Sequence, residues 1–219
     1  MMKLLLVRHG LTEWNDAGRF QGQTDVPLSP TGRQQAQALG QRLSEEPLDL
    51  IYVSDLMRTV ETARAVVAYH TCPVIVEPRL REIRFGKWEG MTYAEIARDD
   101  PETLRAWETR APQVSGPGGE TIAQLAGRIQ SFLDDLGQEA AGKTALIVSH
   151  GGTLQVMLCL LLGLPPNQYW QFRLSQASLS EAVLYPEGVI INRLNDTCHL
   201  ESPSEPSLVT ETQDPYAEK

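Results

Sequence analysis

Short runs of apolar residues alternate with segments of helical periodicity along most of the chain. Runs that are apolar at every position are typical of strands buried in a parallel sheet, and the helical segments between them are typical of crossover connections. The alternation predicts an α/β fold with three layers, in which helices cover both faces of a mostly parallel central sheet. Strands are predicted at 3–7, 50–53, 73–76, 145–148, 182–185 and 189–194, and helices at 30–43, 56–69, 93–98, 120–136 and 153–162.

Two of these helices carry start signals. Ser29 precedes Pro30, which is the usual pairing of an N-cap hydroxyl with a proline in the first helical turn. Ser54 and Asp55 follow a predicted strand and are expected to cap the next helix. The last two strands flank 186–188 and are expected to form a hairpin.

Composition limits the kind of protein this chain can be. At 219 residues with 42% hydrophobic content, it is long enough for a well-buried core. The apolar stretch at 4–7 is too short for a signal peptide, and the longest one, 156–164, is far below the roughly 18 residues of a spanning helix. We therefore expect a soluble, cytoplasmic protein without a membrane partner. The net charge of −9 argues against a nucleic-acid-binding protein, because such proteins usually carry a cluster of basic residues.

The chain is expected to form one domain over 1–200. The three cysteines, Cys72, Cys159 and Cys198, lack the spacing of a disulfide framework or a zinc site. The last stretch, 201–219, is rich in Ser and Pro and has five acidic residues against one lysine. A segment of this composition buries little apolar surface, so we expect the tail to be disordered.

Two predicted strands end alike, with LLLVRHG at 4–10 and ALIVSHGG at 145–152. Ligands of open α/β sheets collect at the carboxyl ends of strands, so His9 and His150 are expected at one site. Arg58 lies in the first turn of a predicted helix, where the helix dipole favours an anion over a cation. A single histidine after a strand is more often structural. Two histidines, a cation and free backbone N–H groups at one edge favour a bound anion.

Phosphate chemistry would use each of these side chains. The guanidinium groups of Arg8 and Arg58 can pair bidentately with phosphate oxygens. An imidazole can attack phosphorus when neutral, or stabilise charge when protonated. The leaving oxygen of a phosphate ester needs a proton from a carboxylic acid. The residues alone leave Glu82, Glu89 and Asp55 as candidates for that acid.

Five longer motifs are VRHGLTEWN at 7–15, RFQGQTDVPLSPTGRQQA at 19–36, SDLMRTVETA at 54–63, LREIRFGKWEG at 80–90 and IVSHGG at 147–152. Their order and spacing resemble those of the histidine phosphatase superfamily, which has the phosphoglycerate mutase-like fold. The resemblance runs from about position 3 to position 200. RHG alone is a weak signal, whereas five motifs in the family's order are a specific one.

The resemblance implies a mechanism. It implies that His9 attacks phosphorus and becomes phosphohistidine, and that Glu82 protonates the departing alcohol and later takes a proton from water. No metal and no other cofactor are expected, because the arginines and His150 already supply positive charge. The remaining implied roles are phosphoryl contacts for Arg8, Arg58 and His150, donors from Asn15 and the Gly151 amide, and a mouth lined by Gln21, Thr12 and Gly22.

The segment around Glu82 favours hydrolysis. Mutases of the superfamily carry an ERHYG-like stretch there and a Thr-Gly or Ser-Gly pair near the first loop, whereas this chain has REIRFG and Gln21-Gly22. We expect a phosphomonoester hydrolase, with a cofactor-dependent phosphoglycerate mutase as the alternative and a non-catalytic phospho-ligand-binding protein as a less favoured one. FGKWEGMT and LNDTCHL are similar to segments of α-ribazole 5′-phosphate phosphatases and broad-specificity phosphatases. The expected substrate is a small phosphorylated metabolite: α-ribazole 5′-phosphate, a sugar phosphate, a phosphoglycerate derivative or phosphoserine.

The resemblance also implies a cap over the site, formed by 91–119. Trp107, Arg105 and Arg110 lie in this segment and could contact the rest of the substrate. The favoured interpretation is packing for the tryptophan and solvation for the two arginines. The carboxylate pairs Asp99-Asp100 and Asp134-Asp135 are interpreted as solvated surface charge. Relatives include monomers, dimers and tetramers, so a homo-oligomer is compatible with the sequence.

Overall fold

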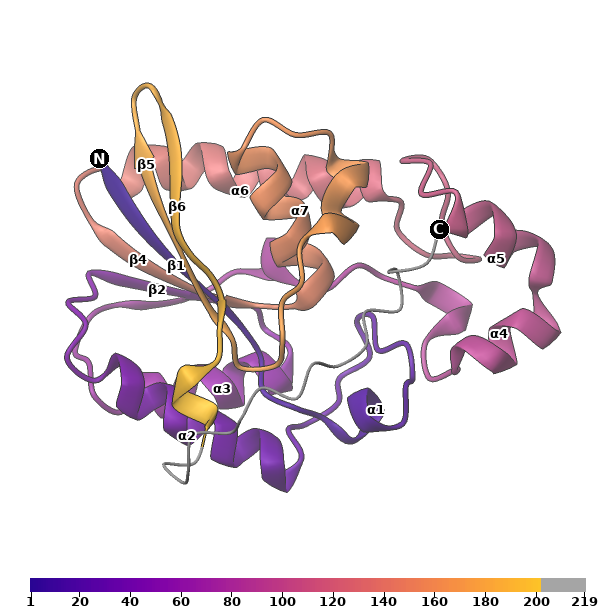
Figure 1. Ribbon diagram of the computed structural model, residues 1–219, viewed down its shortest axis with the longest axis horizontal. Helices are drawn as coiled ribbons and strands as arrows, with labels where there is room; N and C mark the ends of the chain where they lie inside the picture. Colours follow the sequence, from indigo (N-terminus) through magenta and orange to yellow (C-terminus); the bar gives the residue numbers. More distant parts are fainter. Residues whose placement is uncertain (202–219) are drawn as a thin grey trace, which may run out of the picture.

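The centre of the fold is a six-stranded sheet in the computed structural model, which describes residues 1–201 (Figure 1). The strand order is β3-β2-β4-β1-β5-β6. The first four strands run parallel, and β5 and β6 add an antiparallel hairpin. The predicted mostly parallel sheet and the predicted hairpin are therefore confirmed. The strands are β1 (Met2–Arg8), β2 (Leu50–Val53), β3 (Val74–Val76), β4 (Thr144–Ser149), β5 (Leu179–Tyr185) and β6 (Gly188–Asp196).

Helices cover both faces of the sheet, which confirms the predicted three layers (Figure 1). Along β1, Leu5 and Val7 pack with the two helices of one face, while Leu4 and Leu6 pack with those of the other. This alternation follows from the two-residue repeat of a strand. One face carries α2 (Pro30–Leu43) and α3 (Met57–Val67), the other carries α6 (Ile122–Glu139) and α7 (Gly151–Leu161), and α1 (Glu13–Asp16), α4 (Tyr93–Asp99) and α5 (Pro101–Glu108) lie outside these layers.

The helix starts confirm one prediction and correct another. The Ser29 hydroxyl accepts a hydrogen bond from the Gly32 N–H at 3.0 Å, as expected of an N-cap. Helix α3, however, begins without a cap from Ser54 or Asp55. Its first N–H binds the Asp25 carboxylate at 2.7 Å, and Asp55 pairs with Arg81 instead. The cap comes from a distant loop, so local sequence could not identify it.

Helices α4 and α5 form a separate cluster beyond one end of the sheet (Figure 1). Helix α5 is absent from the predicted elements, although Pro101 occupies its first position, where a proline is well tolerated. The cluster is held by Trp88, Ile96 and Leu104, which are all buried. It falls within the segment predicted to be a cap. The predicted boundaries of the domain and of the cap stay predictions, and the predicted disorder of the tail concerns residues outside 1–201, apart from Glu201.

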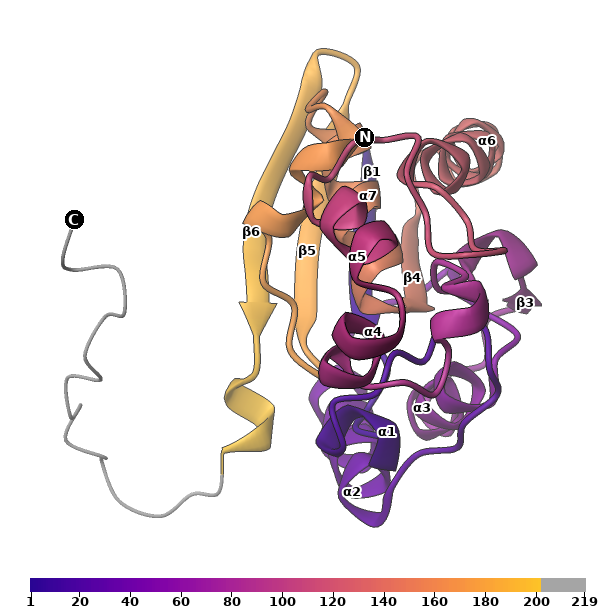
Figure 2. The same ribbon diagram turned by 90° about the vertical axis from the view of Figure 1, so that its right-hand side faces the viewer.

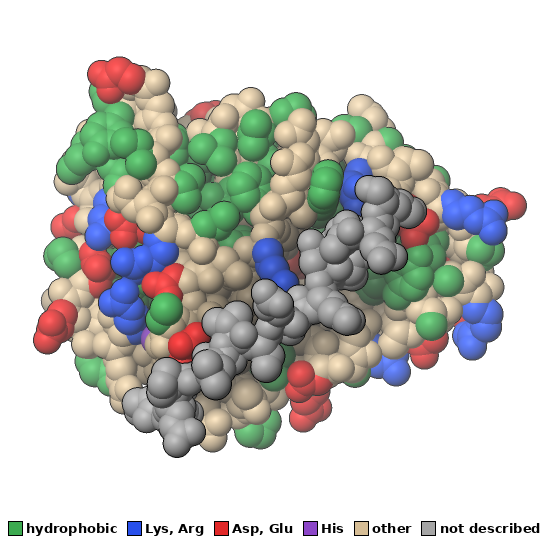
Figure 3. Space-filling view, in the orientation of Figure 1, with side chains coloured by type: hydrophobic (Ala, Val, Ile, Leu, Met, Phe, Trp, Pro, Cys, Tyr) green, Lys and Arg blue, Asp and Glu red, His purple; other side chains and the backbone are tan. Residues whose placement is uncertain are grey.

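The surface carries mixed charge. On the face shown in Figure 3, acidic and basic side chains are interspersed. Strand β6 forms one edge of the sheet (Figure 2), and Ile190 and Leu194 on it are exposed. Within residues 1–201, no helix has the length and apolar character needed to cross a membrane. The three cysteines are free.

Candidate active site

The two similar strand ends come together at one edge of the sheet. Arg8 at the end of β1 pairs with Ser149 at the end of β4, so the residues that follow are neighbours. The rings of His9 and His150 lie edge to face with their centroids 5.2 Å apart. The sheet therefore brings together the two histidines that the sequence pattern predicted at one site.

Beside His9 lies a cavity of about 280 Å³, which we call the phosphoryl cavity. Seven of the ten residues predicted for the site line it, and His150, Thr12 and Gly151 do not. Four further lining residues were not predicted, although RF in the second motif contains two of them. The lining consists of Arg8, His9, Asn15, Gly18, Arg19, Phe20, Gln21, Gly22, Arg58, Glu82 and Phe85.

The ring of His9 is held in one orientation by a backbone carbonyl. Its Nδ1 lies 2.7 Å from the Gly10 oxygen, and because a carbonyl only accepts, Nδ1 must carry the proton. In the neutral ring, Nε2 on the opposite side then holds a free lone pair. Burial lowers the pKa of His9 well below its usual value, and the charges of Arg58 and Arg8 lower it further. His9 is therefore a neutral imidazole at neutral pH, which is the nucleophilic form.

The ring of His150 is fully buried and has both nitrogens occupied. Its Nδ1 accepts a hydrogen bond from the Arg58 Nε–H at 3.1 Å, so the neutral ring carries its proton on Nε2. That Nε2–H lies 2.9 Å from the Ser54 hydroxyl oxygen. Burial, followed by the charge of Arg58, lowers the pKa of His150 well below its usual value. The structure thus places His150 behind Arg58, where it orients the guanidinium.

Two arginines supply positive charge to the phosphoryl cavity. Arg58 is fully buried, and its terminal nitrogens donate to the carbonyls of Gly22 at 2.7 Å and Thr24 at 2.9 Å. Burial lowers its pKa to about 10, so it stays a cation at neutral pH. Arg8 donates to the Leu174 carbonyl at 2.6 Å, and its buried Nε has no partner within the described residues. A buried donor without a partner beside this cavity is suited to an anionic ligand.

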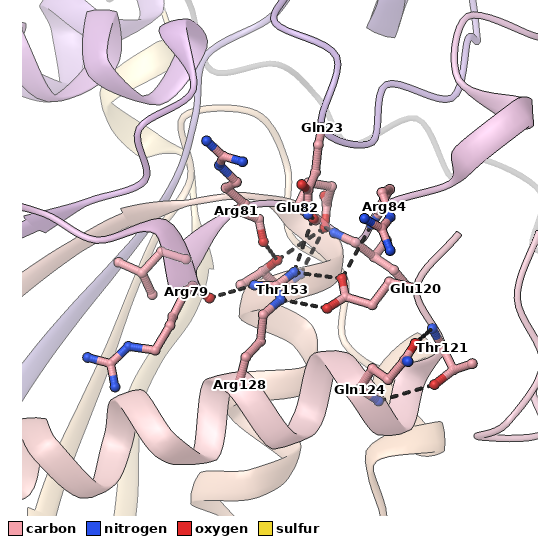
Figure 4. Close-up of polar contacts among 12 residues, drawn as sticks. Gln23, Arg79, Arg81, Glu82, Arg84, Glu120, Thr121, Gln124, Arg128 and Thr153 are labelled. Atoms are coloured by element: carbon pink, nitrogen blue, oxygen red, sulfur yellow. Dashed lines mark hydrogen bonds and ion pairs between the residues drawn. The ribbon is translucent and has the colours of Figure 1, made fainter. Parts of the chain in front are cut away.

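Glu82 is held at the start of α7 (Figure 4). Its carboxylate accepts hydrogen bonds from the backbone N–H groups of Gly152 and Thr153, each at 3.1 Å, and from the Thr153 hydroxyl. The other two candidate acids have different partners. Glu89 binds Thr24 and two backbone N–H groups, and Asp55 pairs with Arg81. Of the three candidates, the structure places Glu82 in the phosphoryl cavity.

A partly buried ion pair supports the Glu82 loop from the side of α6 (Figure 4). Arg128 of α6 donates to Glu120 at 2.7 and 2.9 Å, and to the backbone carbonyl of Glu82 at 3.1 Å. Gln23 donates to the same carbonyl at 3.1 Å. Neither member of the ion pair was among the residues predicted for the site. Its only sequence signal is their separation of eight residues near a helix start, which is too common to be diagnostic.

The other predicted residues shape the loops around the cavity. Thr12 caps α1, and the Asn15 side-chain oxygen accepts from the Thr12 N–H at 3.1 Å, which leaves the Asn15 amide group as a donor. Gln21 is buried, and its side-chain oxygen has no partner within the described residues. Gly22 has φ +55°, and a Cβ there would lie 2.2 Å from Glu89. Gly151 packs beneath Arg8, with an added Cβ 3.2 Å from the guanidinium carbon.

The segment predicted to form a cap contributes packing. Trp107 is partly buried and lies edge to face with Phe85 and Trp88, with centroids 6.3 and 5.9 Å apart. Arg105 and Arg110 are exposed. The interpretation of Asp100 as solvated charge is wrong, because it accepts a hydrogen bond from the Trp88 indole at 3.0 Å. Asp134 is exposed, as expected of surface charge.

Comparisons with known proteins agree with this geometry. A family model of the histidine phosphatase superfamily (branch 1) matches residues 4–197. Phosphoserine phosphatase 1 of Hydrogenobacter thermophilus is 40% identical over 200 residues, which cover 91% of this chain and 95% of that protein. The probable phosphoglycerate mutase GpmB of Yersinia enterocolitica is 34% identical over 209 residues, 93% of this chain and 97% of that protein. The structure of α-ribazole phosphatase from Shigella flexneri matches with a TM-score of 0.84 at 32% identity, covering 90% of this chain and 97% of that one. The chain belongs to the histidine phosphatase superfamily, as its five motifs predicted.

Proposed function

We propose that this protein hydrolyses small phosphate monoesters through a phosphohistidine on His9. Its family and its relatives named as phosphatases make it a phosphatase. The observation that carries the assignment of His9 is its tautomer, because the Nδ1–H bond to Gly10 leaves the Nε2 lone pair available beside the phosphoryl cavity. The nucleophile is therefore preorganised, and no proton has to be removed before it attacks.

In the first step, the bond between His9 Nε2 and phosphorus forms as the bond from phosphorus to the ester oxygen breaks. Phosphoryl transfer depends mainly on positioning and on charge stabilisation. Arg8 and Arg58 are fixed by carbonyls and by His150, so their charges stabilise the transferring group without rearranging. Arg8 lines the phosphoryl cavity, so its positive charge lies beside the negative phosphoryl oxygens.

Glu82 moves the protons in both steps. In its protonated form it gives a proton to the departing alcohol oxygen, which leaves a carboxylate at the start of α7. The backbone N–H groups and the positive end of the helix dipole stabilise that carboxylate. It then takes a proton from the water that attacks phosphohistidine, and inorganic phosphate and free His9 result.

The substrate, the cellular location and the oligomeric state stay predictions. Phosphoserine and α-ribazole phosphate, which the names of two relatives suggest, remain candidates, as do sugar phosphates and phosphoglycerate derivatives. A phosphoglycerate mutase is the second candidate function, supported by the 34% identity to the Yersinia protein. Metal independence, a cytoplasmic location and any homo-oligomer are proposed from the sequence alone.

The test is hydrolysis of p-nitrophenyl phosphate in excess EDTA. Wild-type protein is expected to turn over, and His9→Ala is expected to lose turnover and the acid-labile phosphoenzyme trapped by rapid quenching. His70→Ala is the matched control, because His70 does not line the phosphoryl cavity and contacts the Leu43 carbonyl at the C-terminal end of α2. Phosphoglycerate isomerisation without ester hydrolysis would favour the mutase. Full activity of His9→Ala would contradict the mechanism.

A further inference from the structure

A second cavity adjoins the phosphoryl cavity, and we call it the annex. It has a volume of about 180 Å³ and shares Glu82 and Phe85 with the phosphoryl cavity. An apolar cavity of about 150 Å³ can hold a benzene molecule. The annex is therefore large enough for a six-membered ring. Its lining consists of Glu82, Ile83, Phe85, Trp107, Ile122, Leu125, Gly152, Gln155 and Tyr169.

The annex is lined mainly by apolar and aromatic side chains. Ile122 and Leu125 of α6 form one wall and are buried, and Trp107 of α5 forms another. The Gln155 amide is already bonded to the Phe172 carbonyl. Tyr169 is largely buried, which raises the pKa of its hydroxyl above the usual value. The annex lining contains no lysine or arginine.

The course of the reaction points the alcohol toward this cavity. In an in-line displacement, the attacking nitrogen and the leaving oxygen lie on opposite sides of phosphorus. The leaving oxygen must also lie within hydrogen-bond reach of its proton donor. Glu82 is that donor in the proposed mechanism, and it borders both cavities. The atoms beyond the leaving oxygen then extend past Glu82 into the annex.

We propose that the annex binds the alcohol part of the substrate and selects phosphate esters of alcohols that carry an apolar, planar ring. The proposal rests on the proposed function, because it uses Glu82 as the proton donor. A ring bound in the annex would stack against aromatic side chains and lose its contact with water. The removal of apolar surface from water and the contacts with the aromatic rings would both favour its binding.

An alcohol with a carboxylate fits the annex poorly. Phosphoserine and phosphoglycerates would place a negative charge near Glu82, and no cationic side chain lines this cavity. A buried charge without a partner is strongly unfavourable. Arg110 stacks on the Trp170 ring at 4.6 Å and lines a neighbouring groove with Tyr93 and Glu108, which shares Trp107 and Tyr169 with the annex. The annex therefore disfavours anionic alcohols.

The test compares 2-phenylethyl phosphate with ethyl phosphate, which have similar leaving groups. We expect kcat/KM to be at least about tenfold higher for the phenyl ester, within the range that differential burial in an apolar pocket can give. Tyr169→Ala should reduce this ratio at least threefold. Trp170→Ala is the matched control and should keep the ratio, because Trp170 is the next residue but is half exposed outside the annex.

A binding measurement separates this inference from the proposed function. His9→Ala is titrated with 2-phenylethylphosphonate and with ethylphosphonate, and the phenyl compound is expected to bind at least about tenfold more tightly. Tighter binding of the phenyl compound would support the annex even if the protein hydrolysed no ester. A failure to hydrolyse any ester would contradict only the proposed function. Equal affinities and equal kcat/KM values for the two ligands, or a preference for phosphoserine, would overturn the annex as an apolar subsite.

Discussion

The ends of β1 and β4 carry almost the same sequence and do different work. At the end of β1, His9 has one nitrogen bonded to a carbonyl and the other available beside the phosphoryl cavity. At the end of β4, His150 has both nitrogens occupied, by Arg58 and Ser54. The two neutral rings therefore carry their protons on opposite nitrogens.

The difference shows how hydrogen-bond partners, rather than the local motif, assign a role to a histidine. In the proposed mechanism, the end of β1 presents the nucleophile. The end of β4 is a support: His150 orients Arg58, and the next residues, Gly152 and Thr153, hold Glu82. In that mechanism, one strand end presents the attacking atom, while the other fixes the charge of Arg58 and the proton donor Glu82 around it.

The largest effect should separate the two histidines. His9→Gln removes the nucleophile, and we expect kcat to fall at least about 10⁴-fold. His150→Gln removes only a support, so a fall of about 10- to 100-fold is expected, with phosphohistidine still forming. Rapid quenching and phosphate release measure both quantities. Formation of the phosphoenzyme in His9→Gln, or its absence in His150→Gln, would contradict the different roles assigned to the two histidines.

Arg58→Ala should cost at least about 10²-fold in turnover, because it removes a fixed charge beside the transferring phosphoryl group. Its loss also leaves His150 Nδ1 without its donor. Steady-state hydrolysis of p-nitrophenyl phosphate measures the effect, with the exposed Arg64→Ala on the same helix as the control. A loss under tenfold would contradict the role of Arg58.

Sequence could predict the parts of the molecule that depend on local patterns. The sheet, the three layers and the meeting of His9 with His150 all follow from apolar runs and strand ends. The cap of α3 could not be predicted, because Asp25 reaches it from a separate loop. The support of Glu82 by Arg128 depends on how α6 packs against the loop.

The placement of His150 also escaped sequence reasoning. The family resemblance implied contact with phosphoryl oxygens, whereas the structure gives both of its ring nitrogens to protein partners. A motif specifies that a histidine follows the strand. The direction in which its nitrogens point depends on Arg58 and Ser54, which come from a different part of the chain.

A smaller effect would show how the support of Glu82 is divided between the start of α7 and α6. Thr153→Val removes a hydroxyl bonded to Glu82, and Arg128→Met removes the ion pair behind its loop. Each should lower kcat/KM about tenfold for ethyl phosphate, because its leaving group, ethanol, is poor and needs a proton from the acid. For p-nitrophenyl phosphate, whose leaving group needs no proton, the loss should be less than threefold.

The Glu82→Gln background provides the control for these two variants. Ethyl phosphate hydrolysis should fall strongly in Glu82→Gln itself, and Arg128→Met should cost little more there because the proton donor is already missing. Equal losses on the two esters would show that Arg128 serves folding alone. Undiminished ethyl phosphate hydrolysis in Glu82→Gln would contradict the role of Glu82.

The tautomers can be observed directly by ¹⁵N NMR of the imidazoles. At pH 6 both rings should be neutral, because burial and then Arg58 lower the pKa of each well below 6.5. His9 should show its proton on Nδ1 and His150 on Nε2. Arg58→Met should move the His9 titration to higher pH, since one charge that lowers its pKa is gone. The same tautomer in both rings would contradict the comparison.

The smallest effect is on stability, and here the two histidines should behave alike. Each has a folded pKa below its unfolded value of 6.5, so below pH 6.5 the unfolded chain binds more protons. Their contribution to the free energy of unfolding is present above pH 6.5 and decreases as pH falls below it, by up to about 1.4 kcal/mol per pH unit for each ring. Urea unfolding at pH 7, 6 and 5 measures this slope. His9→Asn and His150→Asn should each reduce it, because burial acts on both rings whatever their hydrogen-bond partners. If only one variant changed the slope, the two strand ends would differ in electrostatics as well as in hydrogen bonding.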